Sequence, residues 1–150
     1  MSKICLVCSS GGHLYQLYCL KDFWGTKEHF WVSFPTQDAE YLLNQEIKYW
    51  AYYPTNRNIV NLIRNIGIAW HILRKERPDY VMSTGAGLAV PFIIIGRILN
   101  IKTVYLESIT RNEELSLSGR LIYPIVDKFL VQWPELVIKY KKAEYQGQVI

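Results

Sequence analysis

The sequence predicts an α/β domain in which a mostly parallel β-sheet is sandwiched between helices. Three observations support this prediction. Short β-prone runs alternate along the chain with stretches whose apolar residues recur at helical spacing, which is the pattern of βαβ units. The run at residues 3–8 is nearly continuous in apolar residues, as a strand covered on both faces is. Glycine-rich turns at residues 11–12 and 85–87 each join a strand to the helix that follows.

The first strand is expected over residues 3–8, because this β-prone run is closed by a Ser/Gly cluster. Residues 13–24 are expected to form a helix, since their leucines recur at helical spacing. The turn through Gly11 and Gly12 then aims free backbone N–H groups and the positive end of the helix dipole at one point. A phosphate is the natural occupant of that point, and a tight turn chosen for steric reasons alone is an equally good interpretation.

This turn matches neither of two common nucleotide-binding loops. The dinucleotide fingerprint requires three spaced glycines and an acidic residue after the second strand. The second strand expected here, residues 29–33, runs instead into Phe34 and Pro35. A P-loop requires Lys-Ser or Lys-Thr after its glycines, and no such pair follows Gly12.

The middle of the chain continues the alternation. A short helix is expected near residues 37–44, and a third strand over 48–53 ends at Pro54. A long helix is expected over 58–77, because Pro78-Asp79 ends the helical pattern there.

The last third of the chain repeats the pattern, with turn residues between the elements. The expected elements are a strand over 80–84, a helix over 88–99, a strand over 102–107, a polar loop over 108–115, a helix near 116–125, a strand over 127–132 and a short helix after Pro134. We therefore expect one Rossmann-like domain over residues 1–150.

The long helix has two interpretations. Its regular stripe is expected to face the core, and it comprises Ile59, Leu62, Ile63, Ile66, Ala69, Trp70 and Leu73. Further apolar residues lie off that stripe, with basic residues beside them: Val60, Ile68, Ile72, Arg57, Arg64, Arg74, Lys75 and Arg77. This arrangement suits an interfacial helix on an anionic membrane surface. A long core helix with a solvated basic face is an equally good interpretation.

Composition limits the class of protein. Of the 150 residues, 50% are hydrophobic, and 11 Tyr and 5 Trp are present, so a sizeable core is expected and disorder is not. The net charge of +4 favours anionic partners, but no basic stripe with interleaved aromatics indicates nucleic acid. The sequence enters a strand almost at once and has no apolar run of about 20 residues, so neither a signal peptide nor a membrane span is expected.

The cysteines do not indicate a metal or redox site. Cys5 and Cys8 have CxxC spacing, but residues three apart on a strand point to opposite faces. We expect them, with Cys19, to be reduced thiols of the cytoplasm, and we expect no metal and no cofactor.

Polar residues gather where strands of the predicted sheet end. In an open parallel sheet, ligands bind beyond the carboxyl ends of the strands. Two glycine turns that open two helices could hold a diphosphate. The expected catalytic groups are His13 and Glu107. The expected diphosphate-binding residues are Ser9, Ser10, Gly11, Gly12, Thr84, Gly85, Ala86, Gly87 and Arg111.

Each of these residues also has a purely structural interpretation. His13 could simply hydrogen-bond the turn, and Glu107 could pair with Arg111. Gly85 and Gly87 could serve close packing of a helix on the sheet.

Five motifs occur in order along the chain. They are Gly11-Gly12-His13-Leu14, Ser83-Thr84-Gly85-Ala86-Gly87-Leu88-Ala89-Val90-Pro91, Tyr105-Leu106-Glu107-Ser108-Ile109-Thr110-Arg111, Asp127-Lys128-Phe129-Leu130-Val131-Gln132-Trp133-Pro134 and Tyr145-Gln146-Gly147-Gln148-Val149. In this order they resemble the asparagine-linked-glycosylation protein fourteen family, whose bacterial members act in capsule and exopolysaccharide synthesis. The family is similar to the amino-terminal, acceptor-side half of MurG-type GT-B glycosyltransferases.

The resemblance implies a hexosyltransferase that is made of two chains. This chain alone would be inactive. This chain would bind a lipid-diphosphate-linked sugar acceptor, and a separate donor-binding subunit would supply the UDP-sugar. The eukaryotic members carry an amino-terminal anchor that we do not expect here, so membrane contact would be peripheral, on the inner face of the cell membrane. The partner would dock on the rim loops and on the segment over 133–150.

The sequence departs from the MurG-type pattern at two places. The MurG-type loop has one more glycine turn ahead of its histidine, and it has Glu-Gln-Asn where this chain has Glu107-Ser108-Ile109. Two functions of other classes remain open: a free-standing nucleotide-binding Rossmann enzyme, and a structural recruiter without site residues of its own.

Overall fold

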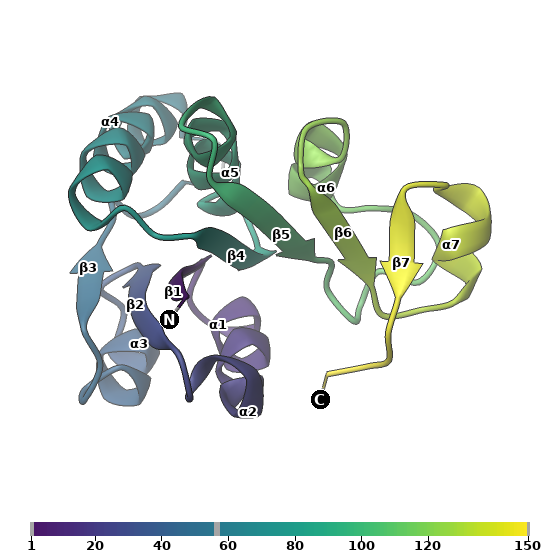
Figure 1. The fold of residues 1–150 in the computed structure, drawn as a ribbon, viewed down its shortest axis with the longest axis horizontal. Helices are drawn as coiled ribbons and strands as arrows, with labels where there is room; N and C mark the ends of the chain where they lie inside the picture. Colours follow the sequence, from purple (N-terminus) through teal and green to yellow (C-terminus); the bar gives the residue numbers. More distant parts are fainter. Residues whose placement is uncertain (1, 56–57, 150) are drawn as a thin grey trace.

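The computed structural model describes residues 2–55 and 58–149, and within them it confirms the Rossmann-like α/β fold (Figure 1). The strands are β1 (Lys3–Cys8), β2 (Glu28–Ser33), β3 (Lys48–Trp50), β4 (Tyr80–Gly85), β5 (Lys102–Leu106), β6 (Lys128–Val131) and β7 (Ala143–Tyr145). The helices are α1 (Gly12–Tyr18), α2 (Lys21–Trp24), α3 (Gln37–Leu42), α4 (Ile59–Glu76), α5 (Ala89–Ile98), α6 (Leu117–Ile122) and α7 (Glu135–Lys139).

All strand pairs are parallel, and the strand order is β3-β2-β1-β4-β5-β6-β7. The chain steps outward from β1 to β3 and then returns through α4 to β4, on the other side of β1. The direction of winding therefore reverses between β1 and β4, which is the point where open α/β sheets bind ligands.

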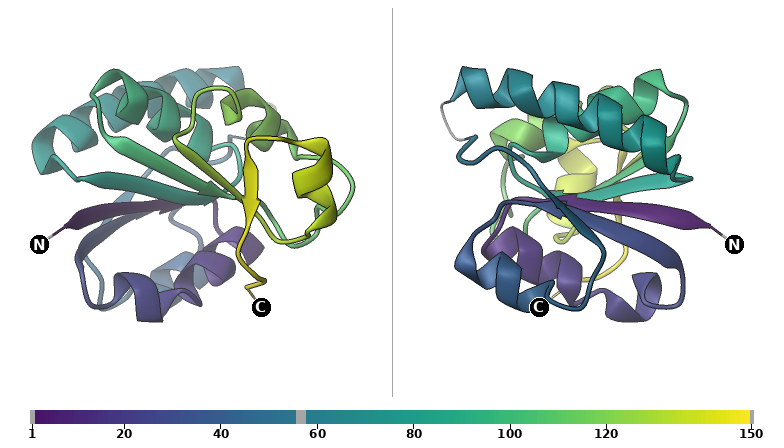
Figure 2. Two further views of the ribbon diagram at one scale, coloured as in Figure 1. Left: turned by 45° about the vertical axis from the view of Figure 1, so that its right-hand side comes forward. Right: turned by 90° about the vertical axis from the view of Figure 1, so that its left-hand side faces the viewer.

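Helices cover the sheet from both sides, as Figure 2 shows with the sheet nearly edge-on. The helices α1, α2 and α3 pack on one face around Trp24 and Trp31, and α4 to α7 pack on the other around Phe92 and Phe129. This layering follows from right-handed crossovers, because strands added in opposite directions place their helices on opposite faces.

The two strand cysteines lie on opposite faces, as predicted. Cys5 belongs to the core under α4 and α5, whereas Cys8 belongs to the core under α1 and α3. Both are fully buried, and burial raises the pKa of each thiol. They are therefore inert packing residues and not a metal or redox pair.

The helix expected over 13–24 is interrupted. α1 ends at Tyr18 and α2 begins at Lys21. The break lets Trp24 turn under the sheet, where its indole donates to the carbonyl of Leu17 at 2.9 Å and its ring meets Trp31 edge-on at 5.1 Å. Burying a tryptophan with a satisfied N–H outweighs one continuous helix here.

The expected core-facing stripe of the long helix is confirmed at Ala69 and Leu73 and is wrong at four other positions. Ile59, Ile63, Ile66 and Trp70 of α4 are exposed, whereas polar and other apolar positions face the sheet. The buried residues of α4 are Asn61, Asn65, Ala69, Ile72 and Leu73.

The reason is the backbone that precedes α4. Asn61 donates to the carbonyl of Pro54 at 2.7 Å, and Asn65 accepts from the N–H and donates to the carbonyl of Tyr52 at 2.9 and 3.1 Å. The backbone groups of this irregular segment have no strand partner among the described residues at these positions, and the two asparagines supply one. These bonds also replace sheet pairing beyond Trp50, so β3 is shorter than the strand expected over 48–53.

The carboxyl-terminal part contains a strand that the sequence did not predict. β7 pairs with β6 through Val131 and Tyr145. The short helix expected after Pro134 is confirmed as α7, and it packs on this chain's own sheet, because Leu136 is buried in the core and Tyr140 packs partly against it. Among the described helices, none combines the length and the hydropathy needed to cross a bilayer.

Candidate functional site

A cleft of about 660 Å³ opens at the carboxyl ends of β1 and β4, where the winding of the sheet reverses. Its walls come from five connections that are far apart in sequence: the β1–α1 turn, the residue after β2, the loop between β3 and α4, the β4–α5 turn and the loop between β5 and α6. The residues that line it are Ser9, Ser10, Gly12, His13, Gln16, Phe34, Tyr53, Pro54, Thr55, Ala86, Gly87, Ser108, Thr110, Arg111, Ser116, Leu117 and Ser118.

The two glycine turns are tied to each other by backbone and side-chain bonds. The N–H of Ser9 donates to the carbonyl of Gly85 at 2.7 Å, and the N–H of Ala86 donates to the hydroxyl of Ser9 at 3.0 Å. The turns therefore form one rigid unit and are not independent loops.

His13 is oriented by Thr84. Its Nδ1 lies 2.9 Å from the carbonyl oxygen of Thr84, while the hydroxyl of Thr84 donates to the carbonyl of His13 at 2.5 Å. A carbonyl oxygen only accepts, so Nδ1 carries the hydrogen of this bond. The neutral ring then leaves Nε2 as its basic nitrogen, on a side chain that lines the cleft.

Glycine is required at Gly85 for two reasons. Its φ is +110°, and a Cβ there would lie 3.0 Å from Nδ1 of His13 and 3.2 Å from the hydroxyl of Tyr105. Gly12 differs, because a Cβ there would meet nothing within 4 Å. The cleft beside Gly12 is open space, into which a ligand can approach the backbone.

One donor of the first turn is already used within the protein. The N–H of Gly11 donates to the carboxylate of Asp38 at 2.8 Å. A hydrogen bond from Thr36 and that from Gly11 hold the pKa of Asp38 below its ordinary value. Gly11 therefore shapes the turn, with a φ of +82°, and does not line the cleft.

Glu107 lies behind the cleft wall. Its side chain is 1% exposed, and its carboxylate accepts from the N–H of Ser108 at 3.0 Å and from the N–H and hydroxyl of Ser116 at 2.9 Å. The hydroxyl of Tyr105 approaches at 3.4 Å, and burial raises the pKa of that tyrosine. The carboxylate thus clamps both ends of the loop over residues 108–115.

The loop that Glu107 clamps carries Arg111 to the cleft. Arg111 is exposed and forms no ion pair with any carboxylate in the described parts of the chain, so the pairing of Glu107 with Arg111 is not found. Of the expected site residues, those at the cleft surface are Ser9, Ser10, Gly12, His13, Ala86, Gly87 and Arg111. Thr84, Gly85 and Glu107 are buried behind the surface, and Gly11 is exposed but lies outside the cleft.

Sequence reasoning missed two parts of the cleft. Pro54 and Thr55 follow the third strand, so the rule about carboxyl ends of strands could have identified them. Ser116 caps α6 by accepting from the N–H of Gly119 at 3.0 Å, and a serine at the start of a helical stretch is a recognisable cap.

The described residues contain no cluster of three or more His, Cys, Asp or Glu side chains arranged to hold a metal ion. The cleft offers backbone N–H groups, hydroxyls, one imidazole and one guanidinium. Such a set suits an anionic, hydroxyl-bearing ligand.

A family model described as "Oligosaccharide biosynthesis protein Alg14 like" matches residues 53–149. The match includes the second glycine turn, Glu107 and Arg111, and it begins after the first turn.

Curated relatives are similar over part of the chain. The fission yeast Schizosaccharomyces pombe protein named UDP-N-acetylglucosamine transferase subunit alg14 is 47% identical over 77 residues, which are 48% of this chain and 37% of that protein. The human subunit ALG14 is 33% identical over 98 residues, 61% of this chain and 45% of its own length. The chain thus spans less than half the length of these relatives.

Two solved structures share the fold at low sequence identity. MurG of Acinetobacter baumannii superposes with a TM-score of 0.75 at 14% identity, covering 89% of this chain and 42% of that one. UDP-N-acetylglucosamine 2-epimerase of Rickettsia bellii gives a TM-score of 0.78 at 16% identity, covering 99% and 45%. At these identities the likeness establishes the fold alone, and the chain corresponds to less than half of either protein.

Proposed function

Because this chain belongs to the family of Alg14-like oligosaccharide biosynthesis proteins, we propose that it is the acceptor-binding, membrane-recruiting subunit of a two-chain UDP-sugar glycosyltransferase. Residues 1–150 would form its acceptor-binding domain. The donor sugar would be presented by a separate subunit. The curated relatives are named subunits of a UDP-N-acetylglucosamine transferase, so UDP-N-acetylglucosamine is the first donor to test.

The observation that carries this proposal is the cleft at the reversal of the sheet. Two linked glycine turns, His13 and Arg111 meet there. A lipid-diphosphate-linked sugar has both an anionic diphosphate and a free hydroxyl, and the cleft has complementary groups for each. Arg111 and the N–H groups beside Gly12 would bind the diphosphate.

His13 would act as the base in an inverting displacement. The acceptor hydroxyl attacks the anomeric carbon of the donor sugar as the bond from that carbon to the UDP oxygen breaks. The hydroxyl proton passes to Nε2 of His13, and the bonding electron pair leaves with UDP, whose charge the partner would stabilise. The bond between Nδ1 and Thr84 keeps the ring in the tautomer that this step requires.

Glu107 would contribute by position. Its carboxylate is occupied by donors from Ser108 and Ser116, so we propose that it acts through the loop that presents Arg111. A buried clamp of this kind fixes a binding group without touching the substrate itself.

Membrane recruitment would use the exposed side of α4. Ile59, Val60, Ile63, Ile66 and Trp70 are 37–72% exposed along this helix. Basic side chains flank them, namely Arg64, Arg74 and Lys75 within α4 and Arg77 at its end, whereas Arg57 lies outside the described residues. An apolar stripe beside basic groups fits the surface of an anionic bilayer. The first turn of α4 follows the loop that lines the cleft, so a lipid-linked acceptor would enter beside the membrane.

We further propose that the pathway is capsular or exopolysaccharide synthesis, at the inner face of the cell membrane. This proposal rests on the resemblance of the ordered motifs to bacterial members of the family. The relatives described above are eukaryotic, so the polysaccharide context requires its own test. Deletion of the gene should abolish the surface polysaccharide and leave other glycans unchanged.

Reconstitution tests the two-chain activity. The full chain, its donor-binding partner, or both are incubated with a lipid-diphosphate-linked sugar and a panel of radiolabelled UDP-sugars. We expect turnover only when both chains are present. Turnover or tight UDP-sugar binding by this chain alone would instead identify a free-standing enzyme. Full activity of a complex that carries His13→Ala and Gly12→Val would identify a structural recruiter.

A further inference from the structure

Gln132 is a fully buried glutamine whose side-chain amide has three partners. It directly follows β6, at the carboxyl end of that strand. Its amide nitrogen donates to the carbonyl of Glu107 and to the side-chain oxygen of Gln16, each at 2.9 Å, and its amide oxygen accepts from the N–H of Val149 at 2.7 Å. One side chain thus joins α1, the end of β5 and the carboxyl-terminal segment, which are far apart in sequence.

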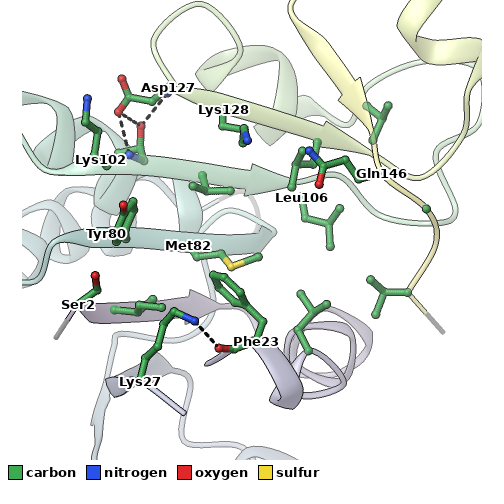
Figure 3. A pocket seen from close by; sticks show the side chains of 18 of the residues that line it. Ser2, Phe23, Lys27, Tyr80, Met82, Lys102, Leu106, Asp127, Lys128 and Gln146 are labelled. Carbon is green, nitrogen blue, oxygen red and sulfur yellow. Dashed lines mark hydrogen bonds between the residues drawn. The ribbon is translucent and has the colours of Figure 1, made fainter. Parts of the chain in front are cut away.

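The carboxyl-terminal partner of Gln132 belongs to an extended segment. Residues 146–149 follow β7, and they line a groove of about 750 Å³ together with Leu106 of β5 and Val131 of β6 (Figure 3). The segment therefore passes the carboxyl ends of these strands, where the backbone N–H of Val149 reaches the amide oxygen of Gln132.

The backbone partners determine which way both glutamine amides face. A carbonyl only accepts and a backbone N–H only donates, so the nitrogen of Gln132 faces Glu107 and its oxygen faces Val149. The second hydrogen of that nitrogen is directed at Gln16 and requires an acceptor there, so the amide oxygen of Gln16 faces Gln132. The amide nitrogen of Gln16 is consequently turned away from Gln132.

Gln16 presents this nitrogen beside the candidate base. Gln16 and His13 are three positions apart on α1, which places their side chains on one face of the helix, and both line the cleft. Within the described part of the chain, the nitrogen of Gln16 has no hydrogen-bond partner. Because its oxygen is occupied, the amide of Gln16 offers a ligand uncharged N–H donors.

We propose that Gln16 is a specificity-determining residue that donates a hydrogen bond to a hydroxyl oxygen of the acceptor sugar, and that Gln132 is the positioning residue that holds its amide in this orientation. This inference rests on the proposed two-chain function. An uncharged donor suits a neutral sugar oxygen, whereas the guanidinium of Arg111 suits the diphosphate. Gln16 lies one helical turn, roughly 6 Å, beyond Gly12, so it would meet the sugar near the hydroxyl that reacts at His13.

The fixed orientation makes this contact selective. A glutamine that is free to turn its amide can donate to one ligand or accept from another, so it discriminates weakly. The oxygen of Gln16 is already occupied, so only a ligand atom that accepts a hydrogen bond satisfies its nitrogen. A sugar without that atom leaves the donor unpaired, and a site built in this way rejects such a sugar.

The test uses the two-chain complex with the lipid-diphosphate-linked sugar that supports turnover in the reconstitution, and with its monodeoxy analogues. For wild type, removal of one hydroxyl other than the reacting one should weaken binding at least tenfold. Gln16→Met is similar in length and has no donor, so it should bind that analogue and the parent sugar within threefold of each other, because the bond is already absent. Gln45→Met, at an exposed position outside the cleft, is the matched control and should discriminate as wild type does.

The role of Gln132 has its own readouts. Gln132→Met should lower the discrimination between the two sugars at least threefold and leave kcat for the parent sugar nearly unchanged, because the amide of Gln16 is then free to turn. Nuclear magnetic resonance of the isotope-labelled wild-type chain gives a signature that needs no variant. The side-chain NH₂ hydrogens of Gln132 should exchange with solvent at least tenfold more slowly than those of Gln16, and the Gln16 signals should shift when the parent sugar binds.

Three results would overturn the inference. They are discrimination by Gln16→Met as strong as that of wild type, an equal loss of affinity for a lipid diphosphate that carries no sugar, and Gln16 signals that do not respond to the parent sugar. The melting temperature of each isolated variant reports whether it has folded. If the wild-type complex turns over in that case, the proposed function stands and only the role of Gln16 fails. If no lipid-linked sugar supports turnover, the proposed function fails first.

Discussion

Thr84 and His13 hold each other through two hydrogen bonds, one from the imidazole Nδ1 to the Thr84 carbonyl and one from the Thr84 hydroxyl to the His13 carbonyl. The two residues belong to different glycine turns and are 71 positions apart in sequence. The bond at Nδ1 determines which ring nitrogen remains basic. The geometry of the candidate base is therefore set by the strand β4 and not only by its own helix.

Two substitutions of His13 separate a basic from a structural role. His13→Ala should lower turnover of the two-chain complex by ~10²–10⁴-fold, the usual effect of losing a general base. His13→Asn keeps a donor for the Thr84 carbonyl and has no basic nitrogen, so it should be equally inactive. The rate of sugar transfer at saturating substrate checks both. Activity of His13→Asn within about threefold of wild type would mean that His13 only holds the turn.

Gly12 and Gly85 should respond differently to substitution. A Cβ at Gly12 meets only open space, so Gly12→Val should leave the melting temperature nearly unchanged and weaken acceptor binding. A Cβ at Gly85 meets His13 and needs a positive φ, so Gly85→Ala should destabilise the fold by ~1–3 kcal/mol. Thermal unfolding gives the stability of both variants, and acceptor titration gives their affinity for the acceptor. If Gly12→Val binds the acceptor as tightly as the wild type does, the acceptor does not bind at this turn.

Substitution of Glu107 should act through the loop that it clamps. In Glu107→Gln an amide NH₂ would face donors from Ser108 and Ser116. The cost of such an unsatisfied pairing is ~1–3 kcal/mol. We expect a lower melting temperature and a raised KM for the acceptor, with a smaller change in kcat. Ser116→Ala, which removes only the hydroxyl bonds, should give a milder form of the same result. A loss confined to kcat would instead favour a direct catalytic role for Glu107.

The exposed stripe of α4 should bind anionic vesicles. Ile63→Asp, at a position 62% exposed, should abolish cosedimentation without unfolding the chain, whereas Ile138→Asp on α7 should have no effect. Binding should weaken as salt rises, because the Debye length shortens from ~10 Å at 0.1 M to ~3 Å at 1 M. Binding that is insensitive to salt, or that survives Ile63→Asp, would contradict this role of α4.

Glu76 should give the fold a pH-dependent stability. Hydrogen bonds from Lys3 and Tyr49 lower its pKa from the ordinary 4.5, and the bond to Glu76 raises the pKa of Tyr49 to about 12. A lowered folded-state pKa stabilises the protein above pH 4.5, and this contribution is lost as the pH falls through the lower value.

Glu76→Gln should therefore cost ~1–2 kcal/mol at pH 7 and progressively less below pH 4.5. Urea unfolding at both ends of this range measures the difference. Glu135→Gln, on the short helix α7, is the control. If Glu76→Gln lowers the free energy of unfolding equally at pH 7 and pH 3, the charge of Glu76 does not cause the stabilisation.

The sequence predicted the fold wherever one local rule was sufficient. Continuous apolar runs and glycine turns located β1, β4 and the cleft between them. The prediction of the buried face of the long helix failed in part, because periodicity alone assigns the isoleucines to the core. It cannot anticipate that Asn61 and Asn65 are needed to hydrogen-bond the backbone of Tyr52 and Pro54. Tertiary hydrogen bonding overrode the hydrophobic pattern at that helix.

The candidate site shows the same limit. Its glycines and His13 were identifiable because turns have local signatures. The position of Glu107 behind the cleft was not, since the distinction depends on Ser116, nine residues away across a loop. The strand β7 was also missed, because three residues with only Ala143 buried carry too little pattern to be recognised.

The sheet ends on both sides in strands of only three residues, β3 and β7. An edge strand presents unpaired N–H and carbonyl groups that can recruit another chain into an extended sheet, and short edges offer few of them. Growth into fibrils by strand addition is thereby discouraged at both margins.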